Sequence, residues 1–527
     1  MKRTLLVLLA GAVTLFPALA QSTSDSAPSA DMTTSQAEAD FFGSSKPTVE
    51  KAKPTTTDPT LAFTAQGTSW GGTLYDKIEW NGGWLDANPN FSSLADNWGD
   101  SVNYTLNNIF YMNSRPDKNF RVKVALVSNW PFTQTVYQPF YTPYQIITIP
   151  ASGSTGNPAT YYTYPLTIPT VRIWELFADV TVDHFLPASW DTNLYIRFGK
   201  QEASWGVAYF YSAGDVLSLT GIDPNNPTAE REGPVALKVS LPFPDQRVDL
   251  SGFVVAPDSV FTPSPGVPAT TPTFRDLGYA LRADASLANL QWALSGYYQR
   301  DQAKKLVGSV SGGLGWLNLP FSKDINWFTE EIAAYGADRW LGTGSQTLGS
   351  SGLTTFTGLS KPWQPYFSNV SGFSYSNSEY NASIRVEYYY NGEGSADQTY
   401  PQKLYNAYLL QLSGNPLFGT NSLLTTNDIV YPGIHNLTAL LSLTTLDNSK
   451  FDASALLQQN FSDGSGWVKP LLTYNFNNFF SLYTGLQFVW GAKGTQFPLQ
   501  FQSYANGNPQ TQRVTLVLGG QIGSQRY

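Results

Sequence analysis

The 527-residue sequence has no cysteine and two histidines, and only 13% of its residues are charged, against about 25% in an ordinary soluble domain. Without cysteine, disulfide scaffolds and thiolate metal sites are excluded. Neither His184 nor His435 has a nucleophile or carboxylate at a spacing typical of catalysis, so no enzyme is predicted. Because nucleotide and zinc motifs are lacking, no cofactor or metal is expected. A net charge of −8 disfavours a nucleic-acid partner.

The N-terminus has the pattern of a secretory signal peptide over residues 1–20. Lys2 and Arg3 precede an apolar stretch from Leu5 to Phe16, and Ala18-Leu19-Ala20 supplies small residues for cleavage. No later window holds 18 consecutive apolar residues, so a transmembrane helix is not predicted. Residues 21–59 are rich in Ser, Thr, Ala and Pro, which predicts a disordered periplasmic linker.

From residue 60 to residue 527, apolar residues alternate with small or polar ones. The pattern is clear in residues 120–126, 194–198, 382–388 and 513–518. Residues i and i+2 share a face only in an extended strand. A secreted β-sandwich or propeller remains an alternative, but the signal peptide and segments of about ten residues favour a transmembrane antiparallel β-barrel. Aromatic residues near segment ends predict interfacial girdles. They include Trp174, Tyr298, Trp327, Tyr388, Tyr389, Tyr390 and Trp490.

Connection lengths predict about 18 strands, because short periplasmic turns alternate with long extracellular loops. The expected long loops are 73–99, 132–168, 202–231, 257–273, 338–365, 392–432 and 491–510. The alternation requires a strand at Phe367 to Tyr375, followed by a turn at 376–379. The last amphipathic strand and the terminal Tyr527 fit a signal for the barrel-assembly machinery.

The polar face of each segment is expected to line a water-filled lumen, since charges facing lipid cost a few kcal/mol near the midplane. The candidate lumen-lining and selectivity residues are Arg121, Lys123, Glu175, Asp179, Arg197, Lys238, Arg282, Asp284, Arg385, Glu387, Lys469 and Arg513. Asp249 and Asp452 belong to the same face. Opposed basic and acidic rows would select hydrated polar solutes, or they would simply brace the interior.

The long loop at 202–231 carries several carboxylates. Asp215, Asp223 and Asn225 lie in one stretch of it, and Glu230 and Glu232 follow after that stretch. We interpret it as a solvated acidic loop. The alternatives are an inward-folded constriction or a Ca²⁺ site, although no spacing matches the regular calcium loop.

Residues 194–234 resemble a stretch of Gram-negative outer-membrane barrels of the alginate-export type and related porin-like families. The resemblance rests on Leu194-Tyr195-Ile196-Arg197-Phe198-Gly199-Lys200-Gln201-Glu202, then Trp205-Gly206, Asp215 and Arg231-Glu232-Gly233-Pro234. It implies a large monomeric barrel that acts as a passive channel.

The expected function is therefore a porin-like channel in the outer membrane of a Gram-negative (diderm) bacterium. It would pass small hydrophilic solutes by diffusion, with outer-membrane lipid as its surroundings. The alternative is a largely closed barrel that displays long loops as a surface adhesin or receptor.

Overall fold

The computed structural model describes most of the chain from residue 64 onward. The described ranges are 64–65, 68–85, 98–130, 147–149, 159–161, 171–183, 187, 192–211, 213–219, 221–222, 227, 231–257, 273–317, 322–348, 353–377, 379–412, 424, 428, 431–446, 450–477, 479–505 and 508–523. The predicted signal peptide, the predicted linker, His184 and Tyr527 lie outside these residues.

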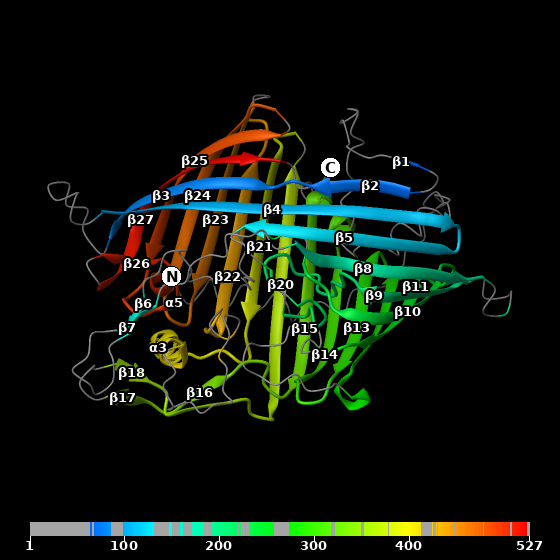
Figure 1. Ribbon diagram of the computed structural model, residues 1–527, viewed down its shortest axis with the longest axis horizontal. Coiled ribbons are helices and arrows are strands. Elements are labelled where there is room, and N and C mark those ends of the chain that lie inside the picture. The colour runs from blue at the N-terminus through cyan, green and yellow to red at the C-terminus, as the bar shows by residue number, and fades with distance from the viewer. Residues whose placement is uncertain are drawn as a thin grey trace. The chain divides into compact units, whose positions relative to one another are not determined.

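The described strands form a closed antiparallel β-barrel of 18 strands, which confirms the predicted fold class and strand number (Figure 1). Each strand pairs with the next along the chain, and β27 pairs with β3 to close the ring. The barrel strands are β3 (Asp76–Leu85), β4 (Trp98–Asp117), β5 (Phe120–Trp130), β8 (Val171–Val182), β9 (Leu194–Lys200), β10 (Val235–Phe243), β11 (Val248–Val255), β12 (Gly278–Leu287), β13 (Leu290–Tyr298), β14 (Lys304–Gly313), β15 (Ile325–Tyr335), β20 (Pro365–Asn377), β21 (Ala382–Tyr390), β22 (His435–Leu443), β23 (Phe451–Asn460), β24 (Ser465–Asn475), β25 (Phe480–Trp490) and β27 (Asn508–Ile522).

The outer face of the barrel is apolar, and the opposite face carries the charges. Phe198, Leu281 and Leu294 lie on this outer face, and they are exposed by 62%, 71% and 56%. The residues next to them in sequence, such as Arg197 and Arg282, make their contacts on the inner side. Such a surface suits hydrocarbon rather than water, because a soluble protein rarely exposes so large an apolar area.

Two predictions about individual segments have opposite outcomes. The strand expected at residues 367–375 is confirmed, because β20 covers it. The long loop expected at 73–99 is wrong, because it contains β3. Together with β2 (Thr68–Thr73), β3 pairs with β4 along nearly its whole length. Lys77, Glu79 and Asn81 of β3 face inward, and these polar residues give the segment the composition of a loop.

The predicted aromatic girdle is correct only in part. Trp327 and Tyr388 alternate with inward residues and so face outward. Trp174 and Tyr389 are buried inside the barrel instead, in two different apolar clusters. A register shift between β5 and β8 beside Trp174 changes which face that residue occupies.

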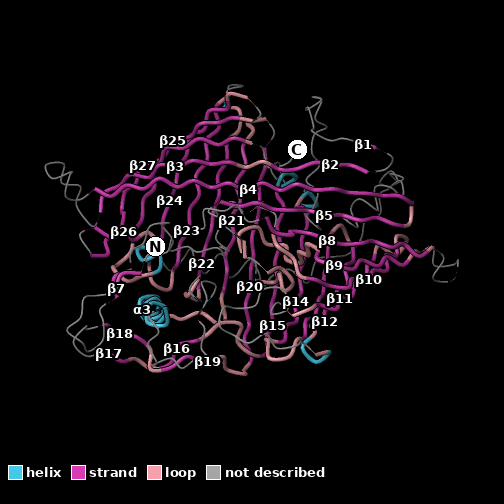
Figure 2. Tube along the Cα trace, viewed as in Figure 1, coloured by secondary structure: helices cyan, strands magenta, loops and turns pink. Residues whose placement is uncertain are grey.

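The connections carry small elements of their own (Figure 2). They are β1 (Thr64–Ala65), β6 (Ile147–Ile149), β7 (Ala159–Tyr161), η4 (Phe274–Asp276), η5 (Gly315–Leu317), η6 (Ser322–Asp324), β16 (Leu341–Thr343), β17 (Gln346–Leu348), β18 (Leu353–Thr355), β19 (Gly358–Ser360), α3 (Tyr400–Leu412), α5 (Gln496–Gln500) and β26 (Gln502–Ala505). We call α3 with the connection 336–364 the cap, which has its own apolar core around Phe356, Leu404 and Ala407. None of the described helices has the length and hydropathy needed to cross a membrane.

Candidate constriction inside the barrel

The connection from β9 to β10 folds into the barrel. We call its residues 201–219 the inner loop. It contacts inward-facing residues of β12, β15, β21 and β22, of which the last three lie far around the ring from β9. Since those strands present apolar residues on their outer face, a loop that touches their other face lies within the lumen.

Two buried carboxylates hold the inner loop by its backbone. Glu387 on β21 accepts hydrogen bonds from the backbone N–H groups of Tyr209 and Phe210, at 2.6 and 2.8 Å. Glu330 on β15 accepts one from the N–H of Val207 at 2.9 Å. Both carboxylates are fully buried. Hydrogen bonds to a buried charged group are among the stronger ones in proteins, so these acceptors fix the path of the loop.

Glycine residues allow the loop to approach Glu330 closely. A Cβ atom on Gly214 would lie 2.2 Å from the Glu330 carboxylate, and one on Gly206 would lie 3.4 Å from it. Asp215 then closes the loop on itself: it accepts from the Trp205 N–H at 3.3 Å and forms an ion pair with Arg231. The Trp-Gly and Asp positions of the sequence resemblance therefore serve to fold this loop.

The tip of the inner loop is seated in an apolar cluster. Phe210 and Tyr211 are almost completely buried. They pack with residues of five strands and α5, namely Val370, Tyr389, Leu456, Trp467, Val489 and Phe497. The Tyr211 hydroxyl also lies 2.8 Å from the Thr438 hydroxyl, and burial raises the pKa of Tyr211 well above its usual value. This half of the lumen is therefore filled by protein.

The prediction that the loop at 202–231 is solvated is wrong for the residues of it that the structure describes. Asp215 is buried and paired with Arg231 rather than hydrated. Glu232 is paired with Lys200 and Arg172. Asp223 and Glu230 lie outside the described residues. The alternative of an inward-folded loop agrees with the structure, because acidic side chains here serve as hydrogen-bond acceptors within the protein.

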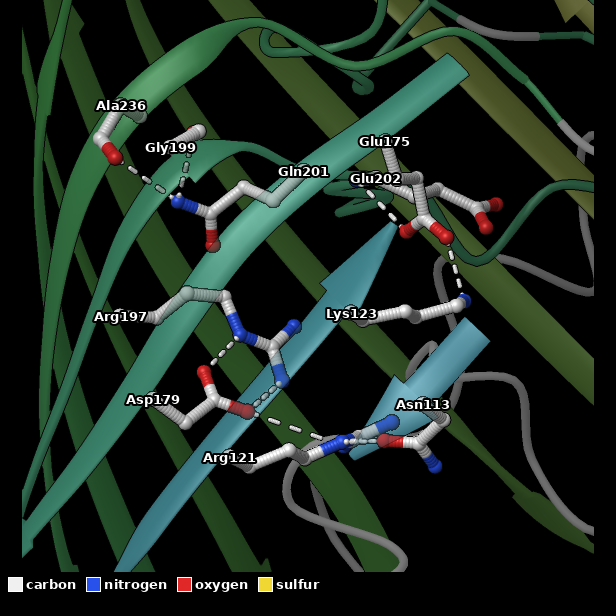
Figure 3. A network of polar contacts seen from close by, with 10 residues as sticks. All are labelled: Asn113, Arg121, Lys123, Glu175, Asp179, Arg197, Gly199, Gln201, Glu202 and Ala236. Atoms are coloured by element: carbon white, nitrogen blue, oxygen red, sulfur yellow. Dashed lines mark hydrogen bonds and ion pairs between the residues drawn. The ribbon is translucent and has the colours of Figure 1, made fainter. Parts of the chain in front are cut away.

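The opposite wall carries paired charges from β5, β8 and β9 (Figure 3). Arg197 donates two hydrogen bonds to Asp179, from Nε at 2.6 Å and from Nη2 at 3.1 Å. Arg121 lies 3.7 Å from the same carboxylate, and Lys123 pairs with Glu175. The guanidinium of Arg197 also lies 4.0 Å from the centre of the Phe177 ring. We call this group the charged wall.

The charged wall continues onto β10, β11 and β12. Arg282 pairs with Asp284 at 2.6 Å, and it also donates to the backbone carbonyl of Trp205 in the inner loop. Lys238 stands over the Phe253 ring at 5.5 Å. Asp249 is opposite Asp284 in the register of β11 and β12. Eight of the twelve predicted lumen residues thus lie on neighbouring strands and face the same way.

The other four predicted lumen residues are placed apart from this wall. Arg385 lies 3.6 Å from the centre of the Tyr209 ring, where it supports the inner loop, and Glu387 anchors that loop. Lys469 is 3.6 Å from Glu79. Arg513 donates to the carbonyl of Gly491, at the start of the connection that holds α5. Asp452, from the same predicted face, binds the backbone N–H of Thr445 in a turn.

Three inward-facing charged residues are not among the predicted lumen residues, namely Lys77, Glu79 and Glu330. Glu79 lies between Lys77 and Lys469, and it accepts a hydrogen bond from the Tyr483 hydroxyl at 2.9 Å. Lys77 and Glu79 fall in the long loop expected at 73–99, so the alternation predicts no face for them. Glu330 was missed because it is followed by Glu331. Adjacent strand residues face opposite sides, so one of the two carboxylates must face inward and the other outward.

No group of three or more metal-ligating side chains is found in the described part of the chain. No known protein family and no curated protein matches the sequence. Among solved structures, a porin of Rhodopseudomonas blastica matches with a TM-score of 0.35 and 8% identity over 86% of this chain and all of its own. OmpT, an outer membrane protein of Vibrio cholerae, gives 0.35 and 9% over 89% of this chain and all of its own. OmpF of Salmonella typhi, in complex with daunomycin, gives 0.36 and 8% over 88% of this chain and all of its own. At these values the fold class rests on the strand pairing described above.

Proposed function

We propose that the chain is an outer-membrane channel through which small hydrophilic solutes diffuse passively, with no catalytic step. The observation that carries this proposal is the inner loop, held across the lumen of a barrel that is apolar outside and charged inside. A purely structural barrel has no need of a loop fixed by two buried carboxylates. A channel does, because such a loop sets the width of its narrowest part.

The charged wall supports the same proposal. The inner loop and its apolar seat fill the side of the lumen formed by β20 to β25. Trp205 and Leu217 of the loop also pack on β10 to β12. The path that is left for water and solutes therefore runs along β5, β8 and β9, where basic and acidic side chains alternate. Such a lining keeps water in the path and favours polar solutes over apolar ones. We infer that these residues bound the constriction together with the inner loop.

Conductance in a planar lipid bilayer tests the proposal. We expect stepwise, ohmic current from single inserted barrels, and uptake of small sugars by vesicles that contain the protein. Folded, inserted protein that gives neither current nor uptake would contradict the channel.

Lys123 is a better probe of ion selectivity than Arg197. Arg197 is held by two hydrogen bonds and its side chain is only 7% exposed, so its replacement would disturb the wall, whereas the Lys123 side chain is 27% exposed. Lys123→Gln should lower the anion preference, because it leaves Glu175 uncompensated in the path. Lys118→Gln is the matched control, since Lys118 lies 80% exposed in a short turn outside the lumen. Equal reversal potentials for the two variants would remove Lys123 from the site.

The cap supports a second candidate function. Its apolar core, with Phe356 and Leu404, makes it a folded unit rather than a set of loose loops. A closed barrel that displays such a unit could serve as an adhesin or receptor. This alternative predicts no current from the intact protein, and binding of surface ligands that is lost when residues 338–362 are shortened.

A further inference from the structure

The inner loop, the cap and α5 all lie at one end of the barrel. They follow β9, β15, β21 and β25, which run in the same direction because an odd number of antiparallel strands separates each from the next. Segments that are far apart in the sequence can therefore meet at this end. One meeting point is Tyr431, which lies just before β22.

The ring of Tyr431 packs against the tip of the inner loop. Its centre lies 5.1 Å from that of the Tyr211 ring, with the two planes at 68°, and 6.5 Å from that of the Tyr389 ring on β21. Gln458 on β23 approaches the Tyr431 hydroxyl at 3.5 Å. Edge-to-face packing depends on the relative position of the two rings, so a displaced Tyr431 would no longer hold Tyr211 in its place.

The backbone of Tyr431 is held from the cap. Arg339, in the connection 336–364, donates from Nη1 to the Tyr431 carbonyl at 3.1 Å. Asn391 donates from Nδ2 to the same oxygen at 3.0 Å. The backbone N–H of Arg339 is in turn bound by Glu393 at 3.2 Å. The cap and the tip of the inner loop are therefore joined through one residue.

Tyr431 has a backbone conformation that a bulky residue rarely adopts. Its φ is +51°, in the left-handed region. Such a conformation costs free energy and persists only where the surrounding contacts hold it. One of those contacts is the hydrogen bond from the cap. If the cap withdraws, the backbone of Tyr431 can relax and carry its ring away from Tyr211. The strain thus gives Tyr431 a second arrangement to move to, as coupling between distant sites requires.

A second contact links the cap with the seat of the tip. Gln402 of α3 lies beside Gly494, just before α5, and a Cβ atom built on Gly494 would be 3.4 Å from the Gln402 Cβ. In α5, Phe497 is buried in the same apolar cluster as Phe210 of the inner loop. The cap therefore reaches the tip by two routes, one through Tyr431 and one through α5.

We propose that the cap regulates the channel. In its observed position it holds the tip of the inner loop in the lumen, and when the cap is displaced the tip loosens and the constriction widens. Tyr431 is a positioning residue in this device, and Arg339 is the point at which the cap holds it. The inference rests on the proposed channel function, and it gives the cap a role in conduction.

Removing the Tyr431 ring tests its contact with the tip. In Tyr431→Ala the fraction of time that the tip is displaced should rise about twofold to tenfold, as for the loss of one aromatic contact. Open-channel noise in a planar bilayer and hydrogen exchange in residues 207–211 both measure it. Tyr431→Phe keeps the ring and is the matched control, which should behave like the wild type. Equal behaviour of the two variants would overturn the inference.

Arg339→Met tests whether the cap is responsible. It removes the hydrogen bond to the Tyr431 carbonyl and leaves the inner loop itself unchanged. Hydrogen exchange in residues 207–211 should become about twofold to tenfold faster, as for the loss of one hydrogen bond. Arg300→Met is the control, because Arg300 lies at the same end of the barrel with its side chain 54% exposed. Equal exchange in the two variants would overturn the inference.

A disulfide can lock the contact through α5, since the sequence has no cysteine. In Gln402→Cys/Gly494→Cys the Cβ separation of 3.4 Å is close to that of natural disulfides. Oxidation should lower the open-channel noise below that of the wild type, and a reductant should restore it. Gly344→Cys/Thr357→Cys is the matched control, because its Cβ atoms lie 3.3 Å apart within the cap alone. Both glycines also have positive φ, +89° and +66°. The same response to reductant in both pairs would overturn the inference.

Hydrogen exchange reports on the tip whether or not current flows. Wild-type protein that carries no current would overturn the proposed channel and, with it, the regulation. Wild-type current together with a tip that does not respond to Arg339→Met would overturn the regulation alone.

Discussion

The two halves of the barrel interior follow the same alternation and are filled in different ways. On β5 to β12 the inward residues include charged pairs between neighbouring strands, as in Arg197 with Asp179, beside apolar residues such as Phe253, which packs on Trp205 of the inner loop. On β20 to β25 one apolar inward residue from each of five strands packs around Phe210 and Tyr211 of the inner loop, among buried polar residues such as Thr438 and Gln458. Alternation therefore identifies the inward face of a strand. Whether that face meets water or protein depends on where a distant loop is folded.

The largest expected effect comes from removing a carboxylate from the charged wall. Asp179 serves both Arg197 and Arg121, so Asp179→Asn leaves two guanidinium groups facing each other without a carboxylate. We expect a loss of about 3–5 kcal/mol in the free energy of unfolding, as for other buried pairs that lose one partner. Urea unfolding in lipid vesicles, followed by circular dichroism, measures it.

Arg121→Gln is the control for that measurement. It removes one charge from the same site but keeps the two hydrogen bonds between Arg197 and Asp179. We expect a clearly smaller loss of stability. If both variants unfold at the same urea concentration, then the wall is hydrated enough for its pairs to be unimportant, and it does not differ from an exposed surface.

The next largest effect is expected from weakening the attachment of the inner loop to β21. Glu387→Gln replaces a carboxylate that accepts two backbone N–H groups by an amide that can satisfy only one of them. We expect the loop attachment to weaken by about 3 kcal/mol. Single-channel conductance and open-channel noise should both rise, because the loop no longer keeps one position. Asp301→Asn is the control, since Asp301 is exposed in a turn. Unchanged noise would show that the apolar seat alone holds the loop.

A smaller effect is expected where the loop passes Glu330. In Gly214→Ala the new methyl group would lie 2.2 Å from the Glu330 carboxylate, so the loop or the carboxylate must move. Overpacking of this kind costs about 1–3 kcal/mol. Thermal unfolding should show a lower midpoint than Gly296→Ala, whose methyl group has space. Equal midpoints would mean that the loop adjusts without cost.

The same contrast explains what could be predicted from the sequence. The barrel, its strand number and the inward position of residues such as Arg121 and Asp179 follow from local alternation and connection length. The fold of the inner loop does not, because its partners Glu330 and Glu387 are more than 100 residues away along the chain. Nothing local distinguishes Asp215 as a buried acceptor from a solvated carboxylate. β3 was missed because its inward residues are unusually polar.

The smallest expected effect concerns the cap, whose apolar core is separate from the clusters of the barrel interior. Glu393, just after β21, accepts hydrogen bonds from the backbone N–H groups of Asp338 and Arg339, at 3.0 and 3.2 Å. Burial, and secondly the nearby Asp338, raise the pKa of Glu393 above its usual value.

Because the pKa of Glu393 is higher in the folded protein than in the unfolded chain, its contribution to stability is fully present below the unfolded pKa and declines as the pH rises through the folded one. Hydrogen exchange in residues 336–364 should therefore become faster, relative to Glu393→Gln, as the pH rises above about 4. The difference between the two proteins is the measured quantity, since other carboxylates titrate in both. A difference that stays constant with pH would mean that the two backbone N–H groups compensate fully for the burial of the charge.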